Sequence, residues 1–349
     1  MGRAVISALF AGFLSLSLWA FPLLPLWTNP DNPAYLREIP EILEQAEKEI
    51  LVALSDLRAY SDGTTDPLIL GLCAAAKRGA AVYALLEDAN PSPEREEAVN
   101  KLSACGVNVR NDSPDSTLHT KFLVVDTRFV VVGSTHWTKT ALTRSIQVDL
   151  VFDEPSLAHV FRQFFFYLWE GKTRVKTELP PQPWPEPALI PVLDFPQTQI
   201  TFSVAQELLG RAQSQICVAL YSLTLYPAYF ESPSNLLLQT LAEAATRGVR
   251  VQVILEGGEA DDLSEQNRLS AAWLSVNGAE VRLDPSGITM HAKILLVDGK
   301  HVLVSSANWN YSSLAKNMEA GVALLGTPEL AAFLEAYFTE LWEKCSAVP

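Results

Sequence analysis

The sequence has few cysteines, and their spacing does not suit a metal. Cys73, Cys105, Cys217 and Cys345 form no C-x-x-C pair, which argues against a zinc site. A Cys73–Cys105 disulfide is an option if the chain is exported, but the sequence alone leaves that pairing open. Acidic residues also show no grouping with metal-ligand spacing. We therefore expect neither a metal nor a cofactor.

Positive charge is scarce as well. The chain has 26 Lys and Arg against 40 Asp and Glu, which gives a formal net charge of −14. Binding to a nucleic-acid backbone relies on Lys and Arg that displace counterions, so this balance disfavours a general nucleic-acid binder. A local basic pocket remains compatible with it. Hydrophobic residues make up 48% of the chain, enough for a large core and against global disorder.

Charge is absent altogether from Ala4 to Trp27. A membrane-spanning helix needs about 20 apolar residues, and a secretory signal peptide has a similar basic start and apolar middle. We therefore predict an N-terminal apolar helix within residues 1–28, and the choice between a membrane anchor and a cleaved signal stays open. Both interpretations place the body of the protein outside the cytoplasm.

The chain repeats itself. Ile50–Leu54 returns as Ile216–Leu220, and Cys105–Arg110 corresponds to Asn277–Arg282. Each copy alternates short apolar strands with helices, which is typical of a sheet covered by helices. The pattern predicts an α/β fold made of two duplicated α/β sandwich units.

The boundaries of these units follow from the extent of the repeat. The first unit is predicted over residues 35–170 and the second over 200–345. Residues 171–199 are rich in proline, which forbids a helix and favours extended chain. We interpret them as a connector that crosses the surface between the units.

One stretch in each copy carries titratable residues beside an apolar run. His119-Thr120-Lys121 leads into the first run, and His291-Ala292-Lys293 leads into the second. The two histidines are separated by the same offset as the surrounding repeat. On a strand, residues i and i+2 face the same side, so each His and its Lys point together. An imidazole and an ammonium at the end of a buried strand favour an anionic ligand there.

Two His and two Lys suit phosphodiester chemistry. The ammonium groups can bind the non-bridging oxygens and offset the charge that builds in the transition state. One neutral imidazole can attack phosphorus and form a covalent phosphohistidine. The other, protonated, can donate to the leaving alcohol and then accept a proton from water or a second alcohol. The two histidines should therefore titrate at different pH values.

These segments resemble the signature of the phospholipase D superfamily, H-x-K-x4-D followed by G-S/G-x-N. The resemblance covers residues 35–345 and implies two α/β units that share one active site. It implies that His119 is the nucleophile, that His291 is the general acid and base, and that Lys121 and Lys293 bind phosphate.

The resemblance also implies supporting residues. Those expected to help hold phosphate are Ser134, Ser306 and Asn308. The acids of the motif, expected to hold a turn, are Asp126 and Asp298. The carboxylates expected to orient a histidine are Asp149 and Glu319. The chain departs from the family pattern at His136, where an Asn is expected, and at Ser305, where a Gly is expected.

Three functions remain open. The first is a monomeric phospholipase D-like enzyme that hydrolyses phospholipids at a membrane surface or transfers them to alcohols, with cardiolipin synthesis as a variant. The second is an extracytoplasmic nuclease, which the net charge disfavours, and the third is a binding protein without catalysis. Aromatic residues near the second motif would line access for a lipid or pack in the core, namely Tyr221, Tyr226, Tyr229 and Phe230. The headgroup is not specified by the sequence.

Overall fold

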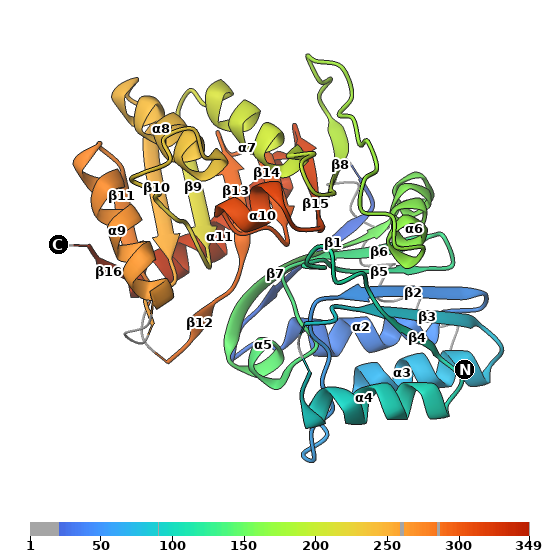
Figure 1. Cartoon of the computed structure of the whole chain (residues 1–349). Helices are drawn as coiled ribbons and strands as arrows, with labels where there is room; N and C mark the ends of the chain where they lie inside the picture. The colour runs from blue at the N-terminus through green and yellow to red at the C-terminus, as the bar shows by residue number, and fades with distance from the viewer. Residues whose placement is uncertain (1–20, 90, 259–261, 285–286, 349) are drawn as a thin grey trace.

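The computed structural model describes residues 21–89, 91–258, 262–284 and 287–348. Two α/β halves lie side by side, and the chain completes the first before it enters the second (Figure 1). Each half has one mixed sheet. The duplicated α/β organisation predicted from the sequence is therefore confirmed.

The first sheet has the order β1-β7-β6-β5-β2-β3-β4. The strands β2, β3 and β4 are parallel to one another, while β5 pairs antiparallel with β2 and continues as an antiparallel meander through β6 and β7. The strands are β1 (Leu23–Thr28), β2 (Glu49–Leu54), β3 (Ala81–Leu86), β4 (Asn108–Asn111), β5 (Lys121–Val125), β6 (Phe129–Gly133) and β7 (Ser145–Asp153).

The second sheet repeats this connectivity in the order β16-β11-β10-β9-β13-β14-β15-β8. A short strand of the second half, β12 (Thr289–Met290), leaves this sheet and pairs with β7 of the first. The strands are β8 (Ala188–Asp194), β9 (Gln215–Leu220), β10 (Arg250–Leu255), β11 (Glu280–Leu283), β13 (Lys293–Val297), β14 (His301–Ser305), β15 (Glu319–Leu325) and β16 (Ser346–Ala347).

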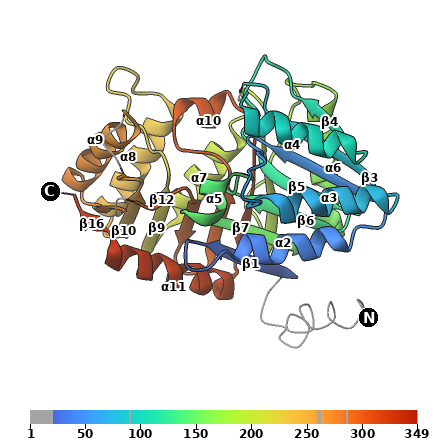
Figure 2. The same ribbon diagram turned by 90° about the horizontal axis from the view of Figure 1, so that it is seen from below.

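Helices cover both faces of each sheet. Figure 2 shows α2, α3 and α4 on the outer face of the first half and α8 and α9 on the outer side of the second. The helices of the first half are α2 (Ala34–Glu44), α3 (Asp66–Lys77), α4 (Pro93–Ala104), α5 (Lys139–Thr143) and α6 (Pro155–Trp169). Those of the second are α7 (Ile200–Arg211), α8 (Pro233–Thr246), α9 (Asp262–Val276), α10 (Tyr311–Ala315) and α11 (Pro328–Lys344).

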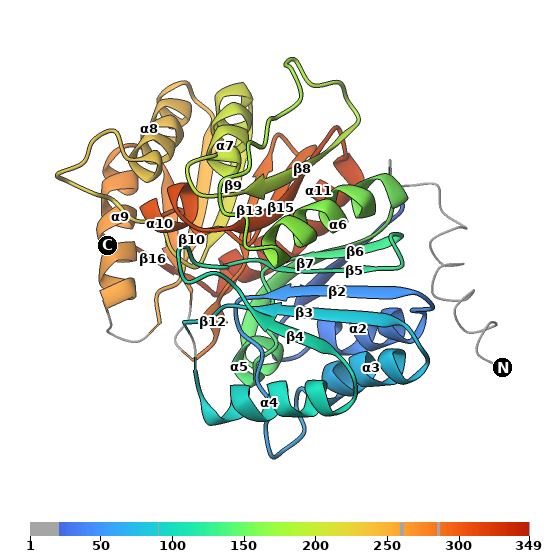
Figure 3. The same cartoon turned by 45° about the vertical axis from the view of Figure 1, so that its right-hand side comes forward.

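A continuous core joins the two halves. Aromatic residues of α6, such as Phe161 and Phe165, pack against Phe122 of β5, and the same cluster includes Val304 of β14 and Phe338 of α11. Figure 3 shows α6 lying along the junction between the sheets. Burial of apolar surface stabilises the halves as one body at about 25 cal/mol per Å². This shared core fixes the position of one motif relative to the other.

The predicted N-terminal helix requires a correction. Leu23–Thr28 is an edge strand, β1, which pairs with β7 and buries Leu26 and Trp27 in the core. Pro25 is tolerated because an edge strand can lack one N–H donor. Residues 1–20, which carry the rest of the anchor-or-signal prediction, lie outside the described residues. In the described ranges no helix combines the length and the apolar character needed to cross a bilayer.

The connector also contains a strand. β8 occupies the end of the predicted 171–199 spacer and pairs with β15 at the edge of the second sheet. It occupies the place that β1 has in the first sheet, and Pro191 of β8 corresponds to Pro25 of β1. The duplicated unit therefore begins one strand earlier than the predicted boundaries at residues 35 and 200.

Candidate active site

Each motif lies where a strand begins. Lys121 is the first residue of β5 and Lys293 the first residue of β13, and each is only 2% exposed. Each ammonium donates a hydrogen bond of 2.7 Å to the carbonyl oxygen of the histidine two residues earlier, His119 or His291. The predicted pairing of His and Lys on one side of the chain is thus present in both halves.

The two motifs meet because each crosses to the other half. The His119 N–H donates to Met318 O over 2.9 Å, and the His291 N–H donates to Ile146 O over 2.9 Å. Each histidine is therefore held against the sheet that carries the other. The ring of His136 lies between them, with centroids 6.2 Å from His119 and 5.0 Å from His291.

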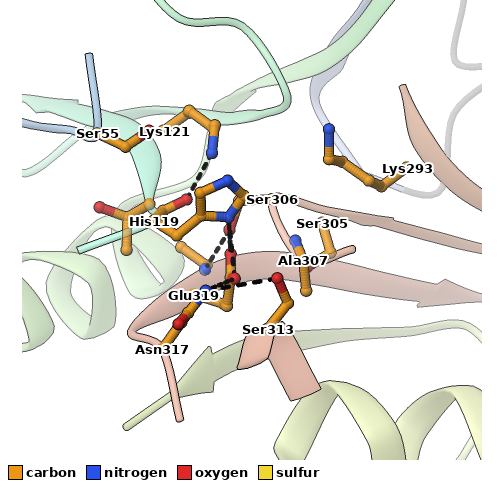
Figure 4. Close-up of polar contacts among 12 residues, drawn as sticks. Ser55, His119, Lys121, Lys293, Ser305, Ser306, Ala307, Ser313, Asn317 and Glu319 are labelled. Carbon is orange, nitrogen blue, oxygen red and sulfur yellow. Dashed lines mark hydrogen bonds and ion pairs between the residues drawn. The ribbon is translucent and has the colours of Figure 1, made fainter. Parts of the chain in front are cut away.

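Glu319 orients His119. The His119 Nδ1 lies 2.9 and 2.8 Å from the two carboxylate oxygens of Glu319, which is fully buried at the start of β15. Ser306 Oγ donates to Glu319 over 2.5 Å and Asn317 Nδ2 over 3.1 Å. Figure 4 shows this cluster beneath the ring, with the second ring nitrogen pointing between Lys121 and Lys293. The carboxylate selects the tautomer with hydrogen on Nδ1, which leaves Nε2 as the reactive atom.

His291 has a neutral partner instead. Its Nδ1 lies 3.0 Å from Gln147 Oε1 and 3.2 Å from Ser134 O. Ser134 Oγ donates to Gln147 Oε1 over 2.7 Å, as Ser306 does to Glu319. Gln147 therefore occupies in β7 the place that Glu319 has in β15. The two histidines share one geometry but differ by one charge.

This finding corrects the prediction for Asp149. Asp149 is buried on β7, but its carboxylate accepts from the Thr135 N–H at 3.2 Å and from Thr135 Oγ1. It holds the loop after β6 and makes no hydrogen bond to a histidine among the described residues. Burial raises the pKa of Asp149 to about 6. The sequence prediction did not include Gln147, although the offset of 172 residues that aligns the histidines also aligns Gln147 with Glu319.

Ser134 and Ser306 also differ from their predicted role. Both are fully buried, and their hydroxyls donate to Gln147 and Glu319 rather than facing the cleft. They support the residues that orient the histidines. Asn308 is 8% exposed, and its buried Oδ1 has no hydrogen-bond partner in the described part of the chain.

His136 takes the place of Asn308 in the first half. Its Nδ1 lies 3.0 Å from Ser55 Oγ. Burial and the nearby Lys121 hold the pKa of His136 well below its usual value, which favours a neutral ring. Ser305, the other departure from the family pattern, uses its hydroxyl to accept from the Ala307 N–H at 3.1 Å. It therefore holds the backbone before Asn308.

Asp126 and Asp298 hold turns away from the histidines. The Asp126 carboxylate accepts three backbone N–H bonds of 2.8 Å from the segment that begins β2. Asp298 does the same for the segment that begins β9. Both residues have φ of 53°, in the left-handed region that Asp tolerates. This geometry agrees with a structural role.

The lysines are electrostatically poised for an anion. Burial lowers the pKa of Lys121 to about 7, and burial together with Lys121 holds the pKa of Lys293 well below its usual range. Figure 4 shows the two ammonium groups facing the same space beside His119. A phosphate in that space would favour the charged form of both lysines. The site therefore offers two imidazoles and two ammoniums to one phosphodiester.

The cysteines and potential metal ligands lie apart from this chemistry. Cys73 and Cys105 form a disulfide between α3 and the end of α4, while Cys217 and Cys345 are buried free thiols. Within the described residues, no group of three or more His, Cys, Asp or Glu is placed to hold a metal ion.

The fold and the site define a class: two-lobed enzymes that handle phosphodiesters with paired His-x-Lys motifs. The family model described as "Cardiolipin synthase, PLD-like domain" matches residues 39–169 and 206–342, well over half of the chain. The chain belongs to this family, within the phospholipase D superfamily.

Individual relatives agree with this assignment. Cardiolipin synthase B of Shigella flexneri is 25% identical over 317 residues, which cover 84% of this chain and 73% of that protein. Phospholipase D Y of Dictyostelium discoideum is 28% identical over 158 residues, and the match spans 43% of this chain and only 36% of that protein. A crystal structure of phosphatidylserine synthase from Haemophilus influenzae Rd KW20 superposes with a TM-score of 0.74 at 14% identity, covering 93% of this chain and 87% of that one, and shows the same fold.

Proposed function

We propose that the protein cleaves the phosphodiester of a phospholipid and passes the phosphatidyl group to water or an alcohol through a phosphohistidine. His119 Nε2 attacks phosphorus while Lys121 and Lys293 bind the non-bridging oxygens. The leaving alcohol takes a proton from His291. Water or a second alcohol then gives its proton to His291 and displaces His119 from phosphorus, which restores the enzyme.

The difference between Glu319 and Gln147 carries the assignment of roles. Attack by His119 places positive charge on its ring, and the Glu319 carboxylate 2.8 Å away stabilises that charge. His291 has only an amide partner, and burial together with Lys293 holds its pKa well below the usual value. A weakly basic imidazole gives up its proton readily, which suits the general acid.

A phospholipid is the substrate that the surroundings of the site support best. Tyr229 and Phe230 are 71% and 73% exposed and line a hollow of about 830 Å³ with Tyr226 and Tyr311. Large exposed aromatics favour contact with an apolar partner, and Tyr is common at membrane–water interfaces. Cardiolipin synthase B and phospholipase D Y are named for the same class of substrate, and the net charge of −14 disfavours DNA.

The acceptor distinguishes hydrolysis from synthesis. The match to cardiolipin synthase B extends over 84% of the chain, which favours a lipid alcohol as a second candidate acceptor. The disulfide supports our further proposal that the enzyme works as a monomer at a membrane surface outside the cytoplasm, where disulfides persist.

The test uses the purified full chain with EDTA present. We expect turnover of phosphatidylcholine or phosphatidylglycerol vesicles, a phosphatidyl-alcohol when ethanol is added, and loss of both products in His119→Ala. Cardiolipin formed from phosphatidylglycerol would identify the synthase. Cleavage of single-stranded DNA without lipid turnover would overturn the proposal in favour of a nuclease.

A further inference from the structure

Two buried carboxylates touch the chain immediately before the histidines. Glu87 follows β3 and Glu256 follows β10, and they are 5% and 6% exposed. Glu87 Oε2 accepts from the Leu118 N–H, one residue before His119. Glu256 Oε2 accepts from the Met290 N–H over 2.6 Å, one residue before His291. The same contact is thus made once in each half.

A second carboxyl group stands behind each one. Asp284 Oδ2 shares the Met290 N–H with Glu256 at 3.1 Å, and Asp284 Oδ1 accepts from the Gly257 N–H at 2.6 Å. Two carboxylate oxygens on one N–H lie too close for both groups to be charged at low cost. Burial and then the charge of Glu256 raise the pKa of Asp284 to about 8. The two carboxyl groups therefore compete for the same amide, and one proton shared between them relieves the repulsion.

The first half has a looser version of this pair. Asp112 Oδ1 accepts from the Asp88 N–H at 2.8 Å, while its buried Oδ2 has no hydrogen-bond partner within the described ranges. Burial, followed by the charge of Glu87, raises the pKa of Asp112 to about 7. Glu87 thus accepts from the Leu118 amide beside a second buried carboxyl group, as Glu256 does from Met290.

These contacts lie where the backbone has little other support. Leu118 forms a single bridge with Met318, and β12, which contains Met290, has two residues. Both segments have just left their own sheet to reach the other half. A charge-assisted bond to the residue next to each histidine restricts where its ring can lie. The contacts that Glu87 and Glu256 make with Leu118 and Met290 are to backbone amides, so each carboxylate can act on the neighbouring ring through the chain.

We infer that Glu87 and Glu256 are positioning residues, each of which fixes one reacting histidine through the amide that precedes it. Glu87 positions the nucleophile His119, and Glu256 positions the general acid His291. The inference rests on the proposed function for these two roles. The inference predicts that variants of Glu87 and Glu256 respond differently to a change of substrate. Attack by His119 is needed for every leaving group, whereas proton donation by His291 is needed only for a poor one.

The leaving group provides the test. Bis(p-nitrophenyl) phosphate releases nitrophenolate, which departs without a proton, whereas a choline alkoxide requires one. In Glu256→Ala, we expect kcat/KM for phosphatidylcholine to fall about 30-fold and kcat/KM for the nitrophenyl diester to fall less than about 3-fold. Glu87→Ala should lower both by about the same factor, because attack by His119 is common to both substrates.

Conservative and matched variants complete the design. Glu256→Gln and Glu87→Gln keep an oxygen that accepts from the amide, so they should restore most of the activity lost in the alanine variants. Asp298→Ala removes a carboxylate that accepts backbone amides far from the histidines, and it should change the two substrates equally. Equal losses in Glu256→Ala for both substrates, or no loss, would overturn the inference.

A measurement that does not depend on turnover separates the positioning inference from the proposed function. The ring nitrogens of His291 report its position through their ¹⁵N signals, and the chain has only five histidines to assign. Glu256→Ala should shift or broaden the His291 signals and leave those of His119 unchanged, while Glu87→Ala should do the reverse. If the wild type turned over neither diester, the proposed function would fail. The inference would then be decided by these signals, and unchanged spectra would refute it.

Discussion

The two halves of the molecule share a fold but not a charge at the catalytic residues. Both have the same strand order, the same His-x-Lys geometry and the same serine beneath the orienting residue. The orienting residue differs, with Glu319 for His119 and Gln147 for His291. Duplication supplies two equal imidazoles, whereas the proposed reaction needs a nucleophile and an acid. One carboxylate replaced by an amide is enough to make them unequal.

The rims of the halves differ as well. At the first helix residue after each motif, Lys139 begins α5 and Tyr311 begins α10. Lys139 forms an ion pair of 2.5 Å with Asp62 in the loop before α3. The matching loop before α8 carries the exposed Tyr229 and Phe230. The fold accepts an ion pair at this place, so the aromatic residues of the second half point to a use other than folding.

The largest expected effect comes from replacing each histidine in turn, which tests whether the two have different roles. His119→Asn and His291→Asn should each lower turnover of phosphatidylcholine by about 10³-fold or more. With bis(p-nitrophenyl) phosphate the two variants should separate. His291→Asn still forms the phosphohistidine but hydrolyses it slowly, so it should release a burst of nitrophenolate and keep labelled phosphate.

Rapid-quench kinetics and mass analysis of the trapped protein check this result. His119→Asn should show neither burst nor label. A burst in His119→Asn and none in His291→Asn would reverse the two roles. The lysines are left unchanged in both variants, so the phosphate site itself is preserved.

The next largest effect is expected from a substitution that makes the orienting residues of the two halves alike. Glu319→Gln places an amide under both histidines and removes the charge that stabilises the attacking ring of His119. We expect kcat/KM to fall by about 10²-fold for both phosphatidylcholine and the nitrophenyl diester. Retention of the wild-type rate would show that orientation, rather than charge, is what Glu319 contributes. Thermal unfolding of the variant serves as the control for a folding defect.

The reverse exchange, Gln147→Glu, tests the difference between the halves through the pH profile of kcat/KM. Turnover of phosphatidylcholine requires protonated His291, so kcat/KM falls as pH rises through its pKa. In Gln147→Glu a carboxylate stabilises the imidazolium and raises that pKa, so the fall should move about one pH unit higher. The high-pH limb of the profile for the nitrophenyl diester should move less. An unchanged profile would show that Gln147 does not control the titration of His291.

The duplication and the two His-x-Lys segments could be found in the sequence because both leave local signals. The alternation of apolar strands with helices likewise indicated the α/β class. β1 and β8 were missed because an edge strand that contains proline resembles a tail or a linker until its partner is known. Gln147 was missed because its contact with His291 joins residues far apart in sequence, and β12 because its partner lies in the other half.

A smaller effect is expected at the aromatic rim, by which we mean Tyr226, Tyr229, Phe230 and Tyr311 around the hollow of the second half. Replacement of Tyr229 and Phe230 with serine should weaken activity on phosphatidylcholine vesicles about 10-fold, seen as a higher lipid concentration at half-maximal rate. Turnover of the soluble nitrophenyl diester should not change, because neither residue touches the reacting groups. Leu269→Ser with Val276→Ser removes exposed apolar side chains from α9 and serves as the matched control. Equal losses in both double variants would exclude a specific role for the rim.

The smallest effect on catalysis concerns a third difference between the halves. Cys73 and Cys105 close a loop with a sequence separation of 32 residues, while the matching positions of the second half are Ala242 and Asn277. Replacing both cysteines with serine should lower the free energy of unfolding by about 3 to 4 kcal/mol, since the unfolded chain gains freedom. Rates at 25 °C should change little, because the bond lies on the outer helices, away from both histidines. Hydrogen exchange should show the loss mainly in α3 and α4 and leave α8 and α9 as protected as before. If exchange rose equally in both halves, the shared core would couple them too tightly for the disulfide to act on one alone.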